Sequence, residues 1–194
     1  CSIVIVGGGP AGNMAAETLR REGFGGRITL LSADATLPCD RPTLSKNYLA
    51  GTAPDDWLPL RSAGYYRKHA IDVHLDTRVT AVDAERREVT GADGARHSYD
   101  ALLLATGAAP VRLDLPGVDL PHVHYLRTQV DAQAIVAAAA TARRAVVIGA
   151  SFIGLEFAAS LRAREIEVGF VGRERVGMDK FLGAKLGGYL RALH

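Results

Sequence analysis

The chain contains one short pattern twice: an apolar run, a glycine-rich turn and then an Ala/Leu-rich segment. The first copy joins Ile3–Val6 to Gly7-Gly8-Gly9-Pro10-Ala11-Gly12, and the second joins Ala145–Ile148 to Gly149-Ala150-Ser151-Phe152-Ile153-Gly154. One Gly-x-Gly-x-x-Gly is a weak signal, but a strand before it and a helix after it form the context that a dinucleotide-binding βαβ unit needs. The sequence therefore predicts two nucleotide sites, and two such sites in one chain indicate electron transfer.

The residue types in the two turns have separate mechanical roles. Gly7 and Gly149 allow the tight turn from strand to helix, and Gly9 lets a pyrophosphate approach the backbone. Gly12 and Gly154 let each helix pack closely on its strand. The phosphates then meet unpaired N–H groups at the positive end of the helix dipole.

The second copy has Ser151 where the first has its middle glycine. The Cβ atom of Ser151 narrows the approach to the backbone, while its hydroxyl is able to donate to a phosphate, and we interpret it as a tolerated variant. Pro10 and Ala11 in the first copy, and Phe152 and Ile153 in the second, open the helices beside the expected phosphates.

Composition excludes several classes of function. A net charge of +2 over 194 residues is too small to indicate a nucleic-acid partner. No apolar stretch approaches the ~20 residues of a membrane helix, and no signal-peptide pattern opens the chain, so we expect no membrane association and a cytoplasmic location. The two cysteines, Cys1 and Cys39, form no redox or metal-binding spacing. His122 and His124 lack a third ligand, so no metal is expected and any redox centre must be a bound cofactor.

The order of predicted elements gives an α/β fold with two Rossmann-like three-layer domains, the second incomplete. We place the boundary in a proline-rich linker at 108–121, which gives domains 1–110 and 111–194. The stretch 37–46 is expected to be too irregular for a core element. The remaining expected elements are helices at 11–21, 131–140 and 186–194, a strand at 27–31, an antiparallel layer of strands at 73–75, 78–82, 88–90 and 96–99, and a buried strand at 102–104.

Five ordered motifs resemble one family. They are Gly7-x-Gly9-x-x-Gly12, Arg41-Pro42-x-Leu44-Ser45-Lys46, Ala105-Thr106-Gly107, Leu126-Arg127-Thr128 and Gly149-x-x-x-Ile153-Gly154-Leu155-Glu156. Their order and spacing resemble ferredoxin/rubredoxin reductase-like flavoproteins of the pyridine nucleotide-disulfide oxidoreductase superfamily, in the apoptosis-inducing-factor-like branch. The resemblance covers all 194 residues.

The resemblance implies that the first glycine turn binds FAD and the second binds NAD(P)H. It also implies FAD contacts from Ala11, Arg41, Lys46, Val79, Ala105, Thr106, Gly107 and Arg127, with the Val79 backbone facing the adenine. Lys46 would lie beside the flavin N5 and pair with Glu156, since a fixed cation stabilises the charge that hydride arrival creates there. The plainer alternatives are that Lys46 is a solvated surface lysine and that Glu156 pairs within its own helix.

Two features depart from the family pattern. The family often has a ribose-binding acid at the position of Ala33, and here the nearest acid is Asp34, which is a candidate substitute. Family members are also longer, and their second half completes the nicotinamide domain and encloses the flavin. We therefore expect the chain to be a fragment with little activity of its own.

Three functions stay open. The favoured one is a reductase that passes electrons from NAD(P)H through FAD to an iron-sulfur protein, either of ferredoxin or rubredoxin type or a fused Rieske-like domain. The second is an NAD(P)H oxidase or peroxidase, which the presence of Ser45 in place of a redox cysteine argues against. The third is a non-enzymatic flavoprotein whose redox state controls association.

The end of the strand after the second glycine turn bears on nucleotide preference. An NAD site normally has an acid there, whereas here Gly172 is followed by Arg173 and Arg175. A guanidinium is able to bind a 2′-phosphate through two parallel hydrogen bonds, which favours NADPH. The alternative is that Glu174 turns to the ribose and both arginines are solvated.

Overall fold

The computed structural model describes residues 1–149, 151–172 and 178–193. The chain divides into two compact units, each of which draws on two stretches of sequence. The first unit contains Cys1–Asp40 and Pro59–Ala109, and the second contains Arg41–Leu58 and Pro110–His194.

The first unit is built on a parallel sheet with the strand order β3-β2-β1-β7. Its strands and helices are β1 (Ser2–Val6), α1 (Pro10–Arg21), β2 (Arg27–Leu31), α3 (Ala63–Lys68), β3 (Ile71–His74) and β7 (Ala101–Leu104). Helix α1 begins with a proline at its first position and ends with Arg20 and Arg21, both of which favour a helix at those places. This arrangement confirms the predicted α/β class.

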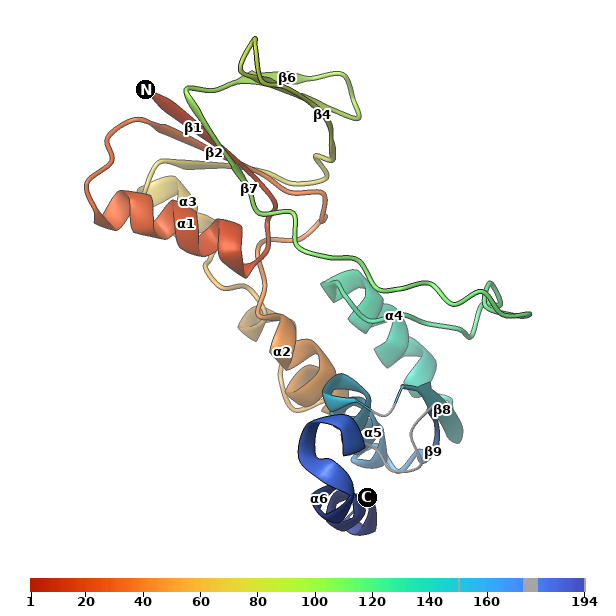
Figure 1. Ribbon diagram of the computed structural model, residues 1–194. Helices are drawn as coiled ribbons and strands as arrows, with labels where there is room; N and C mark the ends of the chain where they lie inside the picture. The colour runs from red at the N-terminus through yellow and green to blue at the C-terminus, as the bar shows by residue number, and fades with distance from the viewer. Residues whose placement is uncertain (150, 173–177, 194) are drawn as a thin grey trace. The chain divides into compact units, whose positions relative to one another are not determined.

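Alternate residues of the parallel strands face two different layers. Ile5, Ile28 and Leu30 pack with Ala16 of α1 and Tyr66 of α3. On the opposite face, Val4, Val6 and Leu31 pack with Val89. Because successive strand residues point to opposite faces, continuous apolar runs such as Ile3–Val6 are what a sheet covered on both sides requires. Figure 1 shows α1 and α3 on one side of the sheet and β4 and β6 on the other.

The covering layer on the second face is antiparallel. Its strands are β4 (Val79–Asp83), β5 (Glu88–Gly91) and β6 (Arg96–Ser98), in the order β4-β5-β6. The prediction of an antiparallel layer was right for these three strands and wrong for the strand near Val73. That strand, β3, pairs in parallel with β2 from Ile28↔Ile71 to Leu31↔His74. The apolar residues of β3 thereby extend the main sheet.

The prediction that residues 102–104 form a buried strand was also wrong in its burial. The strand is present as β7, but Leu104 is 60% exposed and Leu103 is 39% exposed. The reason is its position, since β7 ends the sheet order and pairs only with β1.

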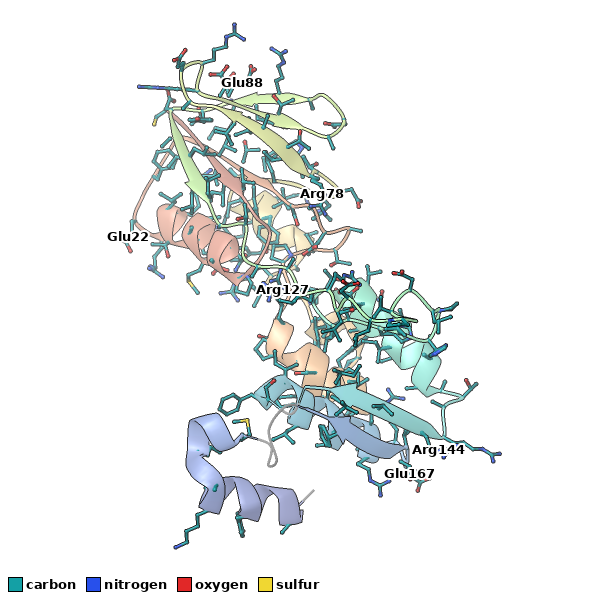
Figure 2. All side chains as sticks on the ribbon, turned by 45° about the vertical axis from the view of Figure 1, so that its right-hand side comes forward. Glu22, Arg78, Glu88, Arg127, Arg144 and Glu167 are labelled. Atoms are coloured by element: carbon teal, nitrogen blue, oxygen red, sulfur yellow. The ribbon has the colours of Figure 1, made fainter. Side chains whose placement is uncertain are left out.

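The second unit has a parallel pair of strands joined by a helix. Its elements are α2 (Arg41–Thr43), the π-helical turn η1 (Leu44–Tyr48), the 3-10 turn η2 (Asp55–Trp57), α4 (Gln129–Ala139), β8 (Arg144–Ile148), α5 (Phe152–Arg162), β9 (Glu167–Val171) and α6 (Asp179–Leu193). Strands β8 and β9 pair from Arg144↔Glu167 to Ile148↔Val171, and the first of these pairs is labelled in Figure 2. Residues 105–128 contain no helix or strand.

The core of the second unit joins elements that are distant in sequence. Leu49, Ile135, Leu161 and Ile166 form its buried centre. On the other face of β8, Val146 is 67% exposed and Ile148 is 58% exposed, so this strand is covered on one side only. Within the described residues, no helix combines the length and the apolarity needed to cross a bilayer.

The stretch around Arg41 corrects another expectation. It was predicted to be irregular, but α2 and η1 form a helical segment that is interrupted only by a kink at Lys46, and Leu44, Ser45 and Tyr48 in it are buried. A proline at the second position of a helix needs no N–H partner, so Pro42 starts this segment rather than breaking it.

Candidate functional site

The first glycine turn lies at the C-terminal end of β1. Gly7 has φ +124°, and a Cβ atom on it would overlap the carbonyl oxygen of Ala105, so only glycine fits. A Cβ atom on Gly12 would overlap the carbonyl oxygen of Gly7, which shows how closely α1 packs on the turn. Gly9, the N-cap residue of α1, provides no side-chain cap. The N–H groups of the first turn are therefore suited to receive an anion.

Other predicted residues lie at the same edge of this sheet. Ala105 follows β7 and its N–H donates to the carbonyl of Val6 at 2.8 Å, while Gly107 has φ +70°. Thr106, between them, is exposed. Val79 opens β4 and packs beside the cluster of Val4, Val6, Leu31 and Val89. Its side chain is thus used for packing, and Val79 pairs with Gly91 of β5.

Asp34 is placed by Ser32, the buried residue that follows β2. The N–H of Asp34 donates to Ser32 Oγ at 3.2 Å, and the carbonyl of Ser32 accepts from Thr77 N at 2.7 Å. A Cβ atom on Gly8 would overlap Ser32 Oγ, so the glycine turn and the loop after β2 are in direct contact. This contact puts Asp34 beside the first glycine turn, while Ala33 is exposed.

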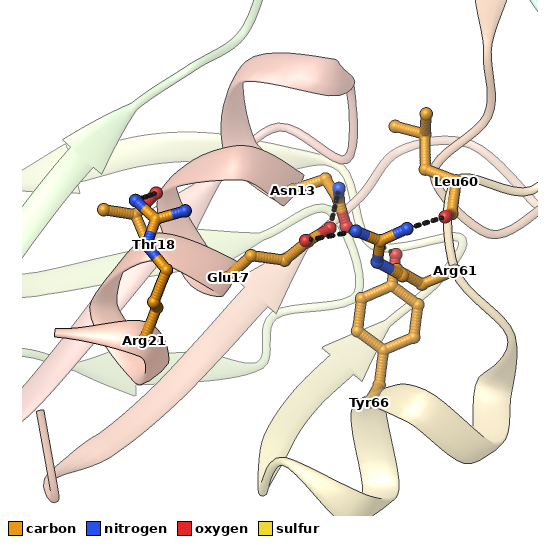
Figure 3. Close-up of polar contacts among 7 residues, drawn as sticks. All are labelled: Asn13, Glu17, Thr18, Arg21, Leu60, Arg61 and Tyr66. Carbon is orange, nitrogen blue, oxygen red and sulfur yellow. Dashed lines mark hydrogen bonds and ion pairs between the residues drawn. The ribbon is translucent and has the colours of Figure 1, made fainter. Parts of the chain in front are cut away.

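A polar network supports the helix that follows the turn (Figure 3). The Tyr66 hydroxyl donates to Asn13 Oδ1 at 2.7 Å, and Asn13 Nδ2 donates to Glu17 Oε1 at 2.6 Å. Arg61 completes it with a hydrogen bond to Glu17 Oε2 at 2.8 Å. Burial, followed by the charge of Glu17, raises the pKa of Tyr66, which therefore stays a donor at neutral pH. The network holds α1 at Asn13, the residue that directly follows Gly12.

The second glycine turn repeats the packing of the first. Gly149 has φ +110°, and its N–H donates to the carbonyl of Val171 at 2.8 Å. A Cβ atom on Gly154 would overlap the carbonyl oxygen of Gly149, just as a Cβ atom on Gly12 would overlap the carbonyl oxygen of Gly7. Ser151 is the N-cap residue of α5 and makes no side-chain cap hydrogen bond. Its hydroxyl is not used to cap the helix.

Phe152 and Ile153 follow Ser151 at the start of α5. They are 54% and 60% exposed. Arg173 and Arg175, proposed above to read the 2′-phosphate, lie outside the described residues, as does Glu174.

An ion pair joins η1 to α5 inside the second unit. Lys46 Nζ lies 2.9 Å from Glu156 Oε2, and Ser45 Oγ donates to the same oxygen at 2.9 Å. The alternative that Glu156 pairs within its own helix therefore does not describe this structure. Lys46 is 45% exposed, so its ammonium is open to a ligand while Glu156 holds it.

The charge of Glu156 depends on these two neighbours. Burial is the largest single influence and acts to raise the pKa of Glu156, but the hydrogen bonds from Lys46 and Ser45 and the charge of Lys46 outweigh it. The pKa of Glu156 is therefore below its ordinary value of 4.5. Glu156 is therefore an anion at neutral pH, placed to form an ion pair with Lys46.

Arg41 and Arg127, the remaining residues that were predicted to contact FAD, also belong to the second unit. Arg41 begins α2, five residues before Lys46. Arg127 precedes α4, and its N–H donates to Asp131 Oδ2 at 3.0 Å within the capping box formed by Thr128 and Asp131. The start of α4 thus fixes the backbone from which the Arg127 side chain departs (Figure 2).

Two serines beside the Lys46–Glu156 pair carried little signal in the sequence. Ser45 stands in a motif quoted above, but its bond to Glu156 was not predicted. Ser160 was missed entirely, and its hydroxyl lies 2.8 Å from the carbonyl oxygen of Ser45. Neither Cys1 nor Cys39 forms a disulfide. Among the described residues, no three His, Cys, Asp or Glu side chains come together in a way that would hold a metal ion.

Comparison with known proteins gives a consistent family. Residues 1–194 match the pyridine nucleotide-disulphide oxidoreductase family. Rhodocoxin reductase from Rhodococcus erythropolis is 40% identical over 193 residues, which cover 100% of this chain and 45% of that protein.

Two solved structures resemble the whole chain. A ferredoxin reductase from Rhodopseudomonas palustris is 36% identical with a TM-score of 0.94, and the match covers 100% of this chain and 48% of that one. The covalent complex of putidaredoxin reductase with putidaredoxin gives 35% identity and a TM-score of 0.91, covering 100% and 47%.

The chain spans about half the length of these relatives. Enzymes of the matched family use FAD and NAD(P)H. The family match extends over both glycine turns and the Lys46–Glu156 pair. This chain belongs to the pyridine nucleotide-disulphide oxidoreductase family.

Proposed function

We propose that the protein containing this chain is an FAD-dependent reductase that takes electrons from NAD(P)H and passes them to an iron-sulfur protein. The observation that carries the proposal is the presence of two glycine turns with the same close packing, Gly12 on Gly7 and Gly154 on Gly149. Two dinucleotide sites in a chain whose cysteines, Cys1 and Cys39, have no redox spacing and form no disulfide indicate a bound electron carrier.

The residues around the first turn fit the pyrophosphate of FAD. The turn from Gly7 to Gly12 offers N–H groups that no side chain caps, at the positive end of α1. Asp34 supplies an acid for the adenosine ribose, and the backbone at Val79 supplies an edge for the adenine. When bound, FAD accepts a hydride and releases electrons singly.

The second turn is assigned to NAD(P)H. Ser151, Phe152 and Ile153 begin α5, where N–H groups and the helix dipole favour a phosphate. The free hydroxyl of Ser151 provides an additional donor. Arg173 and Arg175 are proposed to favour the 2′-phosphate of NADPH over the free hydroxyl of NADH.

Lys46 is assigned to the reducible end of FAD, with further contacts from Arg41 and Arg127. The role of Lys46 is to hold a positive charge where the flavin gains a negative one, and preorganised charge of this kind typically contributes ~10²-fold or more to a rate. Glu156 holds that ammonium in place through the ion pair. Its distance of 2.9 Å from Lys46 is short enough for a charge-assisted hydrogen bond.

The proposed partner is a small iron-sulfur protein of ferredoxin or rubredoxin type, or a fused Rieske-like domain. Support comes from the relatives, which include a rhodocoxin reductase and a putidaredoxin reductase captured with putidaredoxin. Ser45 on η1 has no thiol, which argues against a cysteine-dependent peroxidase.

The test uses the full-length protein. It is expected to purify with the absorption bands of non-covalent FAD, and NAD(P)H should bleach them in stopped-flow mixing. Electrons should then pass to a ferredoxin faster than to O₂. Faster turnover with O₂ would favour the oxidase, and no turnover with any acceptor would favour the non-enzymatic flavoprotein. A colourless protein that takes up no FAD would overturn the proposal.

A matched pair of variants tests the role of Lys46. Lys46→Ala should slow flavin reduction by about 10²-fold while FAD stays bound. Lys68→Ala, which removes an exposed lysine from α3, is the control and should leave the rate unchanged. If Lys46→Ala and Lys68→Ala reduced their flavin at equal rates, Lys46 would have no role in flavin reduction.

A further inference from the structure

Ser160 lies one helical turn after Glu156 on α5. Residues four apart on a helix share a face, so both side chains are directed to η1. Ser160 is only 6% exposed. Its hydroxyl lies 2.8 Å from the carbonyl oxygen of Ser45 and 3.1 Å from that of Lys46. One buried hydroxyl is therefore shared between two consecutive carbonyl groups.

These two carbonyl groups are the ones that define the backbone of Lys46. The carbonyl of Ser45 belongs to the peptide group before Lys46, and the carbonyl of Lys46 belongs to the peptide group after it. The rotation of these two groups sets φ and ψ, which are −110° and −109° at Lys46, outside the helical values of its neighbours. A break of this kind changes the direction in which the side chain leaves the helix.

The same helix also holds the far end of the lysine. Glu156 Oε2 receives Lys46 Nζ at 2.9 Å and Ser45 Oγ at 2.9 Å. Two residues of α5 thus make polar contacts with η1: Glu156 with side chains and Ser160 with the main chain. The two contacts together fix both ends of the Lys46 side chain.

We propose that Ser160 is a positioning residue, which fixes the backbone at Lys46 so that the ammonium group stays on Glu156 and faces its ligand. Its importance for the reaction rests on the proposed function, in which Lys46 stabilises the reduced flavin. Ser45 has a supporting role, because its hydroxyl aligns Glu156 and its carbonyl is the nearer acceptor for Ser160.

A purely structural role for Ser160 makes a different prediction. If the hydroxyl only satisfies buried carbonyl groups, its loss should lower the unfolding temperature, as any defect in the core of this unit would, and should not change the reactivity of Lys46 more than such a defect does. Leu161, the next residue, is 3% exposed and packs in the core of the second unit. Leu161→Ala is therefore a control that removes apolar packing from the same helix, including packing in the cluster that contains Leu49 just after η1, but removes no hydrogen bond to Ser45 or Lys46.

The experiment measures the reactivity of the Lys46 amine in the full-length protein as purified, by competitive acylation with acetic anhydride and mass spectrometry. An amine that is hydrogen-bonded to a carboxylate reacts slowly, because its lone pair is protonated. Ser160→Ala removes the hydrogen bond to the backbone on either side of Lys46 and should thereby weaken the hold of Glu156 on the ammonium. If the whole free energy of one hydrogen bond, about 1 kcal/mol, is lost from that ion pair, the acylation rate of Lys46 should rise about fivefold. Ser160→Thr, which keeps the hydroxyl, should restore the slow rate.

Two further measurements decide the interpretation. Leu161→Ala should lower the unfolding temperature and leave Lys46 acylation unchanged. Glu156→Gln should raise the acylation rate, and adding Ser160→Ala to it should give less than the product of the separate effects, because both act on the same ion pair. An unchanged rate in Ser160→Ala, or an equal rise in Leu161→Ala, would overturn the proposal.

The acylation assay contains no NAD(P)H and does not depend on flavin reduction. If Lys46→Ala reduces its flavin at the normal rate, the proposed role of Lys46 is wrong, while acylation still reports whether Ser160 positions it. If Ser160→Ala leaves acylation unchanged, the positioning proposal fails and the proposed reductase is unaffected.

Discussion

The paired glycines Gly12 and Gly154 allow the two nucleotide sites to be tested separately. In each case the smallest possible side chain, the Cβ atom of alanine, would overlap the carbonyl oxygen of the first glycine of the turn. Cβ atoms essentially never approach other atoms within 3.0 Å, so the helix must move away from the strand in either variant. Overpacking of this kind typically costs about 1–3 kcal/mol of stability.

The displacement also moves the N–H groups that are assigned to a phosphate. Hydrogen bonds to charged groups contribute about 1.5–3 kcal/mol, so misaligning one of them should weaken binding by about 10- to 150-fold. We expect Gly12→Ala to lose FAD during purification and Gly154→Ala to keep FAD while binding NAD(P)⁺ more weakly. Absorbance of the purified protein measures the first effect, and nucleotide titration measures the second.

Gly169→Ala is the control for the second site. Gly169 lies in β9, and an added Cβ atom there meets no atom within 4 Å. This variant should bind both cofactors normally. If Gly154→Ala lost FAD and kept NAD(P)⁺ affinity, the assignment of the two turns would be reversed, and if neither variant changed binding, the close-packing argument would be refuted.

Three further predictions follow from burial, charge and sequence. Leu30→Ala should lower the free energy of unfolding by about 2–5 kcal/mol in denaturant titrations, because Leu30 is fully buried, whereas Val82→Ala at an exposed position should change it by under ~0.5 kcal/mol. Ionised Glu156 stabilises the folded state above pH 4.5, because its pKa is lower in the folded protein than in the unfolded chain. This stabilisation is lost as the pH falls through the lowered pKa. Glu156→Gln should therefore reduce the dependence of the free energy of unfolding on pH in the acid range, as measured by denaturant titrations at several pH values. The ratio of kcat/KM for NADPH to that for NADH should fall in Arg173→Ala and Arg175→Ala, and a strong NADH preference unaltered by both would show that neither arginine binds the 2′-phosphate.

Local sequence patterns were enough to predict both βαβ units. A glycine turn between an apolar run and a helical segment depends on residues that are neighbours in the chain, so α1 and β2 were predicted within a few residues of their observed ends, and α5 was expected after the second turn without stated ends. The roles of Gly7 and Gly12 followed from the same local geometry. The pairing of Lys46 with Glu156 was implied by family resemblance.

Tertiary structure decided how distant segments combine. The pattern around Val73 is that of a short strand, but its parallel pairing with β2 depends on Ile28 and Leu30, more than 40 residues away in the chain. The exposure of Leu104 follows from the place of β7 at the end of the sheet order. A strand pattern determines which residues alternate, whereas burial depends on which neighbours the strand acquires.

The sequence by itself determined the glycine turns, the βαβ units and the charges of Lys46 and Glu156. Only the tertiary structure determined that Ser160 contacts the backbone of Lys46, because the two residues are 114 positions apart. A single serine in an Ala/Leu-rich helix carries no local signal of its partner. Its role depends on a π-helical turn whose backbone departs from helical values, and that geometry arises when η1 packs on α5.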